Sequence, residues 1–341
     1  MSDIVQDINS RSLIEQTLFQ IKPYINNTQI ISSSTLNEFL GHEIYFKLES
    51  LQKTGSFKIR GVLNSLLNLQ NKNKMPSKVT TYSTGNHSIA LAWATAKFFN
   101  VETEIYLPRF TSDIKQSLAQ AYNAKIILTE TRAEAESRAL EAAKQDGCFL
   151  LPPSDHDDII AGASTVSYET LNEMREIDAI FVPIGGGGLA SGTLITKQLF
   201  SPNTKVYAGE PKVANDASIS YQTGKIFRFK NSPETIADGA KTLGLSDKVF
   251  KYIKQLDGIY EISEREILYW TNWFTHLTKI SCEPTSALAI AAAYRFLQNK
   301  TDKQRIAVVI SGGNLEQDTC QQIWAKNYLE ISPEKFNCEE E

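Results

Sequence analysis

Residues 178–192 read Asp178-Ala-Ile-Phe-Val-Pro-Ile-Gly185-Gly186-Gly187-Gly188-Leu189-Ala190-Ser191-Gly192. The apolar run predicts a buried strand, and the segment after the glycines predicts a helix. Consecutive glycines let peptide N–H groups converge on an anion, and the N-terminus of the following helix adds a favourable dipole. Because a tight turn alone needs only one or two glycines, this stretch favours a phosphate site.

The same stretch also fits a dinucleotide fingerprint. Gly185, Gly187 and Ala190 match the pattern G-x-G-x-x-A, and Glu210 follows a predicted strand at the expected interval. A dinucleotide fold usually opens with this motif, whereas here it lies past the middle of the chain. An NAD-binding oxidoreductase therefore stays as a weaker alternative.

Apolar runs alternate with helical patterns on both sides of the glycine stretch. Strands are predicted at residues 43–48, 78–82, 104–107, 125–128, 179–183, 205–208 and 305–310. Helices are predicted between most of them, for example at residues 57–69, 87–99, 133–145 and 286–297. This alternation is typical of parallel sheets covered by helices, so the predicted fold class is α/β.

A second stretch, Thr54-Gly-Ser-Phe-Lys58-Ile-Arg-Gly61, places a lysine near a predicted helix start. Helix N-termini disfavour cations. An electropositive, partly buried site lowers the pKa of a lysine and so favours the neutral amine that attacks aldehydes. Most lysines are solvated surface residues, so the interpretation depends on the other stretches.

Two further polar turns follow predicted strands. Residues 82–88, Tyr-Ser-Thr-Gly-Asn-His-Ser, offer N–H and hydroxyl donors to a carboxylate, although capping of the next helix accounts for the same residues equally well. Residues 306–314 end a predicted strand with Ser311, two glycines and Asn314. Ligands bind at the carboxyl ends of strands in open α/β sheets, so we expect Ser311 and the glycine loop to face one crevice.

Taken in this order, the stretches SFKIRG, STGNH, GGGGLASG and SGGN resemble the fold type II pyridoxal-phosphate enzymes, specifically the branch of serine/threonine dehydratases and serine racemases. The resemblance runs from about residue 30 to about residue 323. It implies a fold like that of the tryptophan synthase β subunit, with two open twisted parallel-sheet domains and the cofactor between them. We expect a large domain at residues 1–75 and 155–330, a small domain at 76–154 and a frayed tail at 331–341.

The resemblance implies that Lys58 holds pyridoxal 5'-phosphate as a Schiff base and later removes the Cα proton of the substrate. Thr84 is the catalytic candidate on the opposite face. Phe57 and Asn86 would contact the cofactor ring, and Ser311 would meet its pyridine nitrogen. The implied phosphate site is Gly185, Gly186, Gly187, Gly188 and Leu189, and the implied substrate-carboxylate site is Ser83, Thr84, Gly85 and His87.

The implied reaction converts L-serine, L-threonine or a related 3-hydroxy amino acid, including a bulkier or more acidic one, to a 2-oxo acid and ammonia. The Ser311 hydroxyl, unlike an aspartate, would not keep the pyridine nitrogen of the cofactor protonated. An unprotonated ring suits prompt loss of a β-substituent. Thr84 is bulkier than the serine of the racemases, which disfavours proton transfer on two faces. An amino-acid racemase with side elimination activity is the main alternative, and a catalytically silent amino-acid sensor is another.

Glu210, Ala214 and Asp216 match the divalent-cation site of the racemase-like branch, where carboxylates, a main-chain carbonyl and waters suit Mg or Ca. Two solvated loop carboxylates are the simpler alternative. Two positions depart from the family pattern. Ser154 replaces an asparagine on the cofactor side, and Ser88 replaces a small residue, which is expected to reshape the substrate pocket.

Charge and cysteine usage point to small-molecule chemistry. The 35 basic and 39 acidic residues form no run of like charge, so no nucleic-acid or membrane surface is expected. The four cysteines lack metal-type spacing and are interpreted as free thiols. No signal peptide or membrane span is recognisable, so we expect a cytoplasmic protein, and we expect it to be a homodimer.

Overall fold

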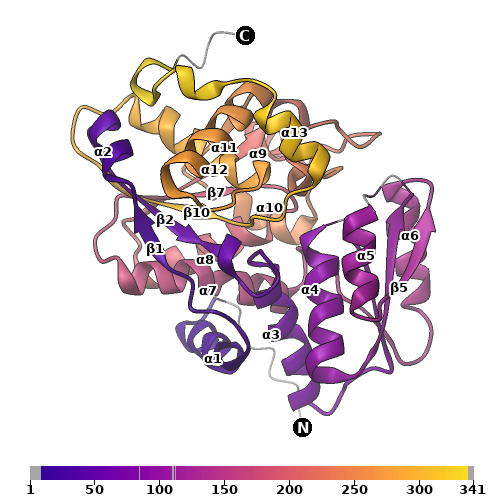
Figure 1. The fold of residues 1–341 in the computed structure, drawn as a ribbon. Coiled ribbons are helices and arrows are strands. Elements are labelled where there is room, and N and C mark those ends of the chain that lie inside the picture. Colours follow the sequence, from indigo (N-terminus) through magenta and orange to yellow (C-terminus); the bar gives the residue numbers. More distant parts are fainter. Residues whose placement is uncertain (1–8, 84, 110, 112, 337–341) are drawn as a thin grey trace.

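The computed structural model describes residues 9–83, 85–109, 111 and 113–336. Among these residues, the strands form two separate sheets, each in its own lobe (Figure 1). In order across the larger sheet the strands are β1 (Ile30–Ser32), β2 (Glu43–Leu48), β10 (Arg305–Ile310), β7 (Ala179–Pro183), β8 (Lys205–Pro211) and β9 (Gly258–Ile262). Across the smaller sheet they are β5 (Lys125–Thr129), β4 (Glu102–Pro108), β3 (Lys78–Tyr82) and β6 (Cys148–Leu150).

Helices cover both sheets. The helices of the first half of the chain are α1 (Arg11–Ile21), α2 (Ser34–Leu40), α3 (Lys58–Asn71), α4 (Asn86–Ala94), α5 (Asp113–Ala121), α6 (Arg132–Ala142) and α7 (Asp157–Glu173). Those of the second half are α8 (Gly188–Phe200), α9 (Asp216–Thr223), α10 (Asp247–Ile253), α11 (Glu264–Thr278), α12 (Pro284–Leu297) and α13 (Gln317–Trp324). A π-helical turn, Thr95–Phe99, extends α4.

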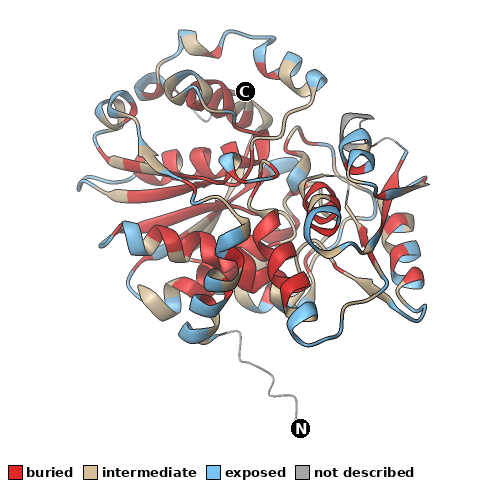
Figure 2. Cartoon of the chain, turned by 60° about the horizontal axis from the view of Figure 1, so that its bottom comes forward, coloured by how far each residue is buried: buried red, intermediate tan, exposed pale blue. Residues whose placement is uncertain are grey.

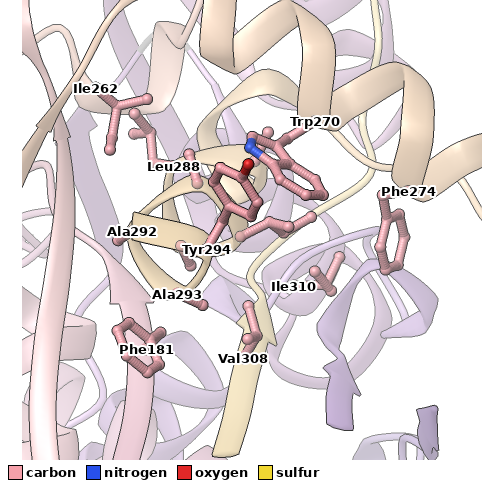
Figure 3. Close-up of a cluster of buried hydrophobic side chains, with 14 of the residues drawn as sticks. Phe181, Ile262, Trp270, Phe274, Leu288, Ala292, Ala293, Tyr294, Val308 and Ile310 are labelled. Atoms are coloured by element: carbon pink, nitrogen blue, oxygen red, sulfur yellow. The ribbon is translucent and has the colours of Figure 1, made fainter. Parts of the chain in front are cut away.

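The larger lobe has an apolar layer on each face of its sheet, and the buried residues concentrate at the middle of the molecule (Figure 2). On one face, Trp270 of α11 and Tyr294 of α12 pack over Phe181 and Val308 of the sheet (Figure 3). On the other face, α7 and α8 pack against each other and against the sheet. A sheet buried on both faces needs nearly continuous apolar strands, which is what the sequence of β7 and β10 provides.

The predicted α/β class with two parallel sheets is confirmed. All strand pairs are parallel except the pair of β1 and β2 at one edge of the larger sheet. The strands of the smaller sheet all come from residues 76–154, and those of the larger sheet come from the flanking segments. The division into two domains with the expected boundaries stays a prediction.

The tail differs from expectation. Residues 331–336 are packed rather than frayed, because the Phe336 ring stacks on Tyr269 with ring centroids 3.7 Å apart. The Tyr294 hydroxyl lies 2.9 Å from the carbonyl oxygen of Pro333 and 2.7 Å from that of Phe336. Buried Phe336 and Pro333, together with these hydrogen bonds, anchor the segment. Residues 337–341 lie outside the described part of the chain.

Two further expectations from the sequence concern the cysteines and membrane-spanning helices. Cys148, Cys282 and Cys320 are free thiols, and Cys338 lies outside the described residues. In the part of the chain that the structure describes, no helix has both the length and the apolar character to cross a membrane.

Candidate active site

The lysine turn and the serine turn are hydrogen-bonded to each other. The peptide N–H of Phe57 donates to the carbonyl of Ser311 at 3.0 Å, and that of Gly313 donates to Gly55 at 2.9 Å. Ser311 follows β10, and Lys58 is the first residue of α3. Two stretches about 250 positions apart in the sequence therefore form one rigid wall.

The Lys58 side chain lies in this wall. Its Nζ donates to the carbonyl of Pro153 at 2.7 Å and lies 5.2 Å from the centroid of the Phe57 ring. Burial lowers the pKa of Lys58 to about 8, although the charge of Glu283 acts in the opposite direction. A large share of Lys58 amines is thus neutral at pH values where an exposed lysine stays protonated.

The four glycines join β7 to α8. Gly187 is the N-cap of α8 with φ of +77°, a conformation that side chains disfavour. A Cβ on Gly186 would lie 2.4 Å from the Oγ of Ser154, so this position also has no room for a side chain. The loop and the first turn of α8 present peptide N–H groups at a helix N-terminus, which is an anion site.

The polar turn after β3 begins α4. Gly85 is its N-cap, Asn86 is the first helical residue, and the first-turn N–H groups of a helix have no partner within it. The His87 Nε2 lies 3.1 Å from the carbonyl of Leu151 and must donate to it, so Nδ1 is an acceptor. Burial and, secondly, the charge of Lys58 lower the pKa of His87 to about 3. A carboxylate here would be bound by backbone N–H groups, because the neutral ring has no donor left.

A side-chain network ties the Asn86 turn to the Ser311 turn. The Asn86 Nδ2 donates to both carboxylate oxygens of Glu283 at 3.0 Å, and its Oδ1 accepts from Asn314 at 2.8 Å. Behind Ser311, the Ser286 hydroxyl lies 3.1 Å from the Ser311 hydroxyl. These hydrogen bonds to Glu283 and Asn314 thus fix the orientation of the Asn86 amide without any ligand.

The motifs meet in one cleft between the lobes. The predicted residues that line it are Phe57, Lys58, Ser83, Gly85, Asn86, His87, Gly185, Gly186, Gly187, Gly188, Leu189 and Ser311. Thr84 lies outside the described residues. A buried amine for an aldehyde, an anion cradle and a hydroxyl at a strand end are the groups that pyridoxal phosphate requires, so the cleft fits this cofactor.

Further residues of the cleft were not assigned a role from the sequence. They include Tyr82, Arg132, Glu136, Arg228, Thr242 and Glu283. For Glu283, the available signal was its position directly before Pro284, since a proline is common at the start of a helix. Arg132 and Arg228 carried no signal, because nothing in their local sequence distinguishes them from surface arginines.

The two departures from the family pattern have different outcomes. Ser154 lies against the glycine loop, where its Oγ faces the Gly186 Cα. Ser88 does not line the cleft, and its hydroxyl donates to the Gly85 carbonyl at 2.7 Å. The expectation that Ser88 reshapes the pocket is therefore wrong, because the bond from its hydroxyl to the Gly85 carbonyl holds its side chain away from the cleft.

The acidic pair predicted to hold a metal does not line the cleft. Both oxygens of Glu210 accept peptide N–H groups, from Ala217 at 2.9 Å and Ser218 at 2.8 Å. Burial raises the pKa of Asp216 to about 7, and burial together with Asp216 raises that of Glu210. Among the described residues, no group of three His, Cys, Asp or Glu side chains is placed to hold a metal ion.

The position of Glu210 also bears on the dinucleotide alternative. That fold needs an acidic side chain facing the cofactor on the glycine side of the cleft. Glu210 is buried and held by the start of α9, and it is not a lining residue of the cleft. Lys58 lines the same cleft as the glycine loop.

Sequence and structure comparisons agree on one family. A sequence profile described as pyridoxal-phosphate dependent enzyme matches residues 21–312. A serine racemase of Schizosaccharomyces pombe is 36% identical over 87% of this chain and 91% of its own length. An L-threo-3-hydroxyaspartate ammonia-lyase of Saccharomyces cerevisiae is 37% identical over 87% and 90%. The solved structure of maize serine racemase superposes with a TM-score of 0.85 at 31% identity, covering 94% of this chain and 97% of that one.

Proposed function

Because the chain belongs to the family of pyridoxal-phosphate dependent enzymes, we propose that it is an ammonia-lyase acting on 3-hydroxy amino acids. The reaction converts L-serine, L-threonine or a related compound to a 2-oxo acid and ammonia. The observation that carries this proposal is the half-buried Lys58, whose pKa falls to about 8 in a cleft shared with the glycine loop. Such a lysine serves both as anchor and as base.

The expected roles follow from the positions of the side chains. Lys58 would hold pyridoxal phosphate, Gly185 to Leu189 its phosphate, and Ser311 its ring nitrogen. The bound cofactor supplies an electron-withdrawing ring that makes the Cα proton of an attached amino acid acidic. We expect the neutral Lys58 amine to take that proton, and the turn at residues 83–87 to bind the substrate carboxylate through N–H donors.

A second candidate is an amino-acid racemase with side elimination activity, which the similarity to serine racemases favours. Racemisation needs a proton donor on the face opposite Lys58. The only candidate from the sequence is Thr84, which lies outside the described residues. Elimination needs the lysine face alone, so we place it first.

An assay of purified enzyme separates the two candidates. With L-serine, L-threonine and L-threo-3-hydroxyaspartate as separate substrates, we expect equal amounts of 2-oxo acid and ammonia from at least one. Chiral analysis of the remaining substrate is the control for racemisation. Accumulation of the D-isomer faster than 2-oxo acid would make the enzyme a racemase, and absence of both products would contradict the proposal.

We also propose that Glu210, the Ala214 carbonyl and Asp216 bind Mg or Ca. Two buried carboxylates with raised pKa values are supporting evidence, since a cation would stabilise both as anions. The Asp216 Oδ2 is buried without a hydrogen-bond partner in the structure. Thr242, a residue of the cleft wall, donates to Asp216 Oδ1 at 3.0 Å, so a bound cation would stiffen that wall.

We expect Mg or Ca at about a hundred times its Kd to raise the free energy of unfolding by about 2.7 kcal/mol over that in chelator. Thermal unfolding of wild type, Asp216→Asn and the exposed control Glu173→Gln tests this. The increase should be lost in Asp216→Asn and kept in Glu173→Gln. An equal response of all three proteins to the cation would place its binding elsewhere.

A homodimer and a cytoplasmic location are further proposals. The family resemblance supports the first, and the second stays a proposal. Sedimentation analysis would test the first and cell fractionation the second.

A further inference from the structure

One wall of the cleft has no role in the proposed function. It is the side of α6 that carries Arg132, Ala135 and Glu136, which all line the cleft. Positions i, i+3 and i+4 share one face of a helix, so this face points at the ligand site. The helix belongs to the smaller lobe, opposite the glycine loop and Ser311 of the larger lobe. A substrate held between the lobes thus has this face on one side.

Arg132 is the unusual member of this face. Its Nη1 donates to the carbonyl of Lys241 at 3.2 Å, whereas its Nε is buried and has no hydrogen-bond partner. Burial lowers the pKa of Arg132, and the charge of Asp238 offsets this only in part. Among the described residues no ion pair involves its guanidinium. A half-buried cation with a buried, unused N–H donor is a natural partner for a carboxylate.

Tyr82 and Arg228 are the cleft residues to compare with Arg132. Burial and, secondly, the charge of the Glu136 carboxylate raise the pKa of Tyr82, so its hydroxyl stays protonated and neutral. The second arginine of the cleft, Arg228, donates its Nη2 to the carbonyl of Leu245 at 3.1 Å and has no buried atom without a partner. Ala135 lies between Arg132 and Glu136 on this face, and its small side chain leaves space there for a group of the substrate.

We infer that Arg132 binds the second carboxylate of a dicarboxylic 3-hydroxy amino acid of the 3-hydroxyaspartate class and selects this substrate over serine. The inference rests on the proposed function, because it uses the same cleft and reaction. The α-carboxylate is bound at the turn of residues 83–87, the amine is at Lys58, and the β-carboxylate extends to α6. The Arg132 Nε then gains the acceptor that it lacks.

A different role for Arg132 is a structural clamp. Its bond to the Lys241 carbonyl joins α6 of the smaller lobe to a loop of the larger one. A clamp would affect all substrates alike, because it holds the cleft closed whatever the substrate side chain is. A carboxylate receptor would affect dicarboxylic substrates only. The two roles are therefore distinguished by the ratio of the rates for dicarboxylic and monocarboxylic substrates. A loss of overall activity would not distinguish them.

The test compares kcat/KM for L-threo-3-hydroxyaspartate and L-serine in wild type, Arg132→Gln and Arg138→Gln. Arg138 lies on the same helix with an exposed side chain, which makes it a matched control. We expect Arg132→Gln to lower the hydroxyaspartate-to-serine ratio about 100-fold, mainly through KM. Arg138→Gln should leave the ratio unchanged. Equal losses for both substrates in Arg132→Gln would overturn the inference in favour of the clamp.

Binding measurements give a readout that is independent of turnover. Calorimetric titration of the holoenzyme with succinate, and with butyrate as the monocarboxylate control, should show tighter binding of succinate in wild type. Arg132→Gln should remove this preference, and Arg132→Lys should keep part of it because the charge remains. A succinate preference that survives in Arg132→Gln would overturn the inference, as would an equal affinity for both acids in wild type.

The same experiments distinguish failure of this inference from failure of the proposed function. A wild-type enzyme that deaminates L-serine but not 3-hydroxyaspartate overturns the role of Arg132 and leaves the ammonia-lyase in place. A wild-type enzyme that releases 2-oxo acid from no 3-hydroxy amino acid overturns the proposed function, and with it this inference.

Discussion

Replacing Lys58 with alanine should lower the release of 2-oxo acid by about 1,000-fold or more, because the cleft loses its anchor and its base in one change. The visible absorption that arises when pyridoxal phosphate is linked to a lysine should disappear as well. The structure places the Lys58 amine inside the cleft, beside Phe57 and Pro153. Absorbance spectra and a 2-oxo acid assay on the same samples measure both effects.

Lys53→Ala is the matched control for this prediction. Lys53 is exposed and lies five residues before Lys58, so its removal should change neither the spectrum nor the rate. Because only the neutral amine attacks an aldehyde, reaction of the apoenzyme with pyridoxal phosphate should accelerate as pH rises towards about 8 and then level off. A K58A protein that keeps the absorption band would show that another lysine holds the cofactor.

The site could be predicted largely because its chemistry depends on backbone geometry. Four consecutive glycines before a helix are more than a turn alone requires, and the observed φ of Gly187 and the close approach at Gly186 both need glycine. The order of the strands in the sheet, by contrast, has no local signature. That Ser311 and Lys58 share one wall follows from β10 lying next to β2, a pairing of segments far apart in the chain.

The residues that sequence reasoning missed acquire their character from burial. Arg132 and Glu283 are ordinary charged residues in the sequence, and only the fold buries Glu283, half-buries Arg132 and places both at the cleft. The strands β1, β6 and β9 were not predicted for a related reason. Two of them are only three residues long, and all three lie at the edges of their sheets, where apolar patterning is weak.

A buried charge network at the base of α3 gives the largest expected effect on stability. Arg60, two residues after Lys58, donates from Nε and Nη2 to both oxygens of Glu49, at 2.7 Å and 2.8 Å. Its Nη1 and Nη2 also donate to Glu169, at 3.0 Å and 2.8 Å, and Lys47 lies 2.8 Å from the same carboxylate. Arg60, Lys47 and Glu49 are fully buried. The two cations and two anions balance one another.

Arg60→Met should lower the free energy of unfolding by about 3–5 kcal/mol, because it leaves two buried carboxylates with one cation. That is a large fraction of the 5–15 kcal/mol typical of a folded protein. Urea denaturation of the apoprotein followed by circular dichroism measures the change. The exposed pair of Arg109 and Glu130 supplies the control, and Arg109→Met should cost about 1 kcal/mol or less.

The double variant Arg60→Met with Glu49→Gln tests whether charge balance, rather than lost packing, is the cause. It leaves Lys47 paired with Glu169, so the buried network is neutral again and part of the lost stability should return. Burial acts to raise the pKa of Glu169, but the charges of Arg60 and Lys47 outweigh it and lower the pKa, so their stabilising effect is present at neutral pH. It is lost as the pH falls below the ordinary glutamate value of 4.5. A double variant less stable than Arg60→Met alone would show that side-chain packing, not the balance of buried charge, holds the first turns of α3 in place.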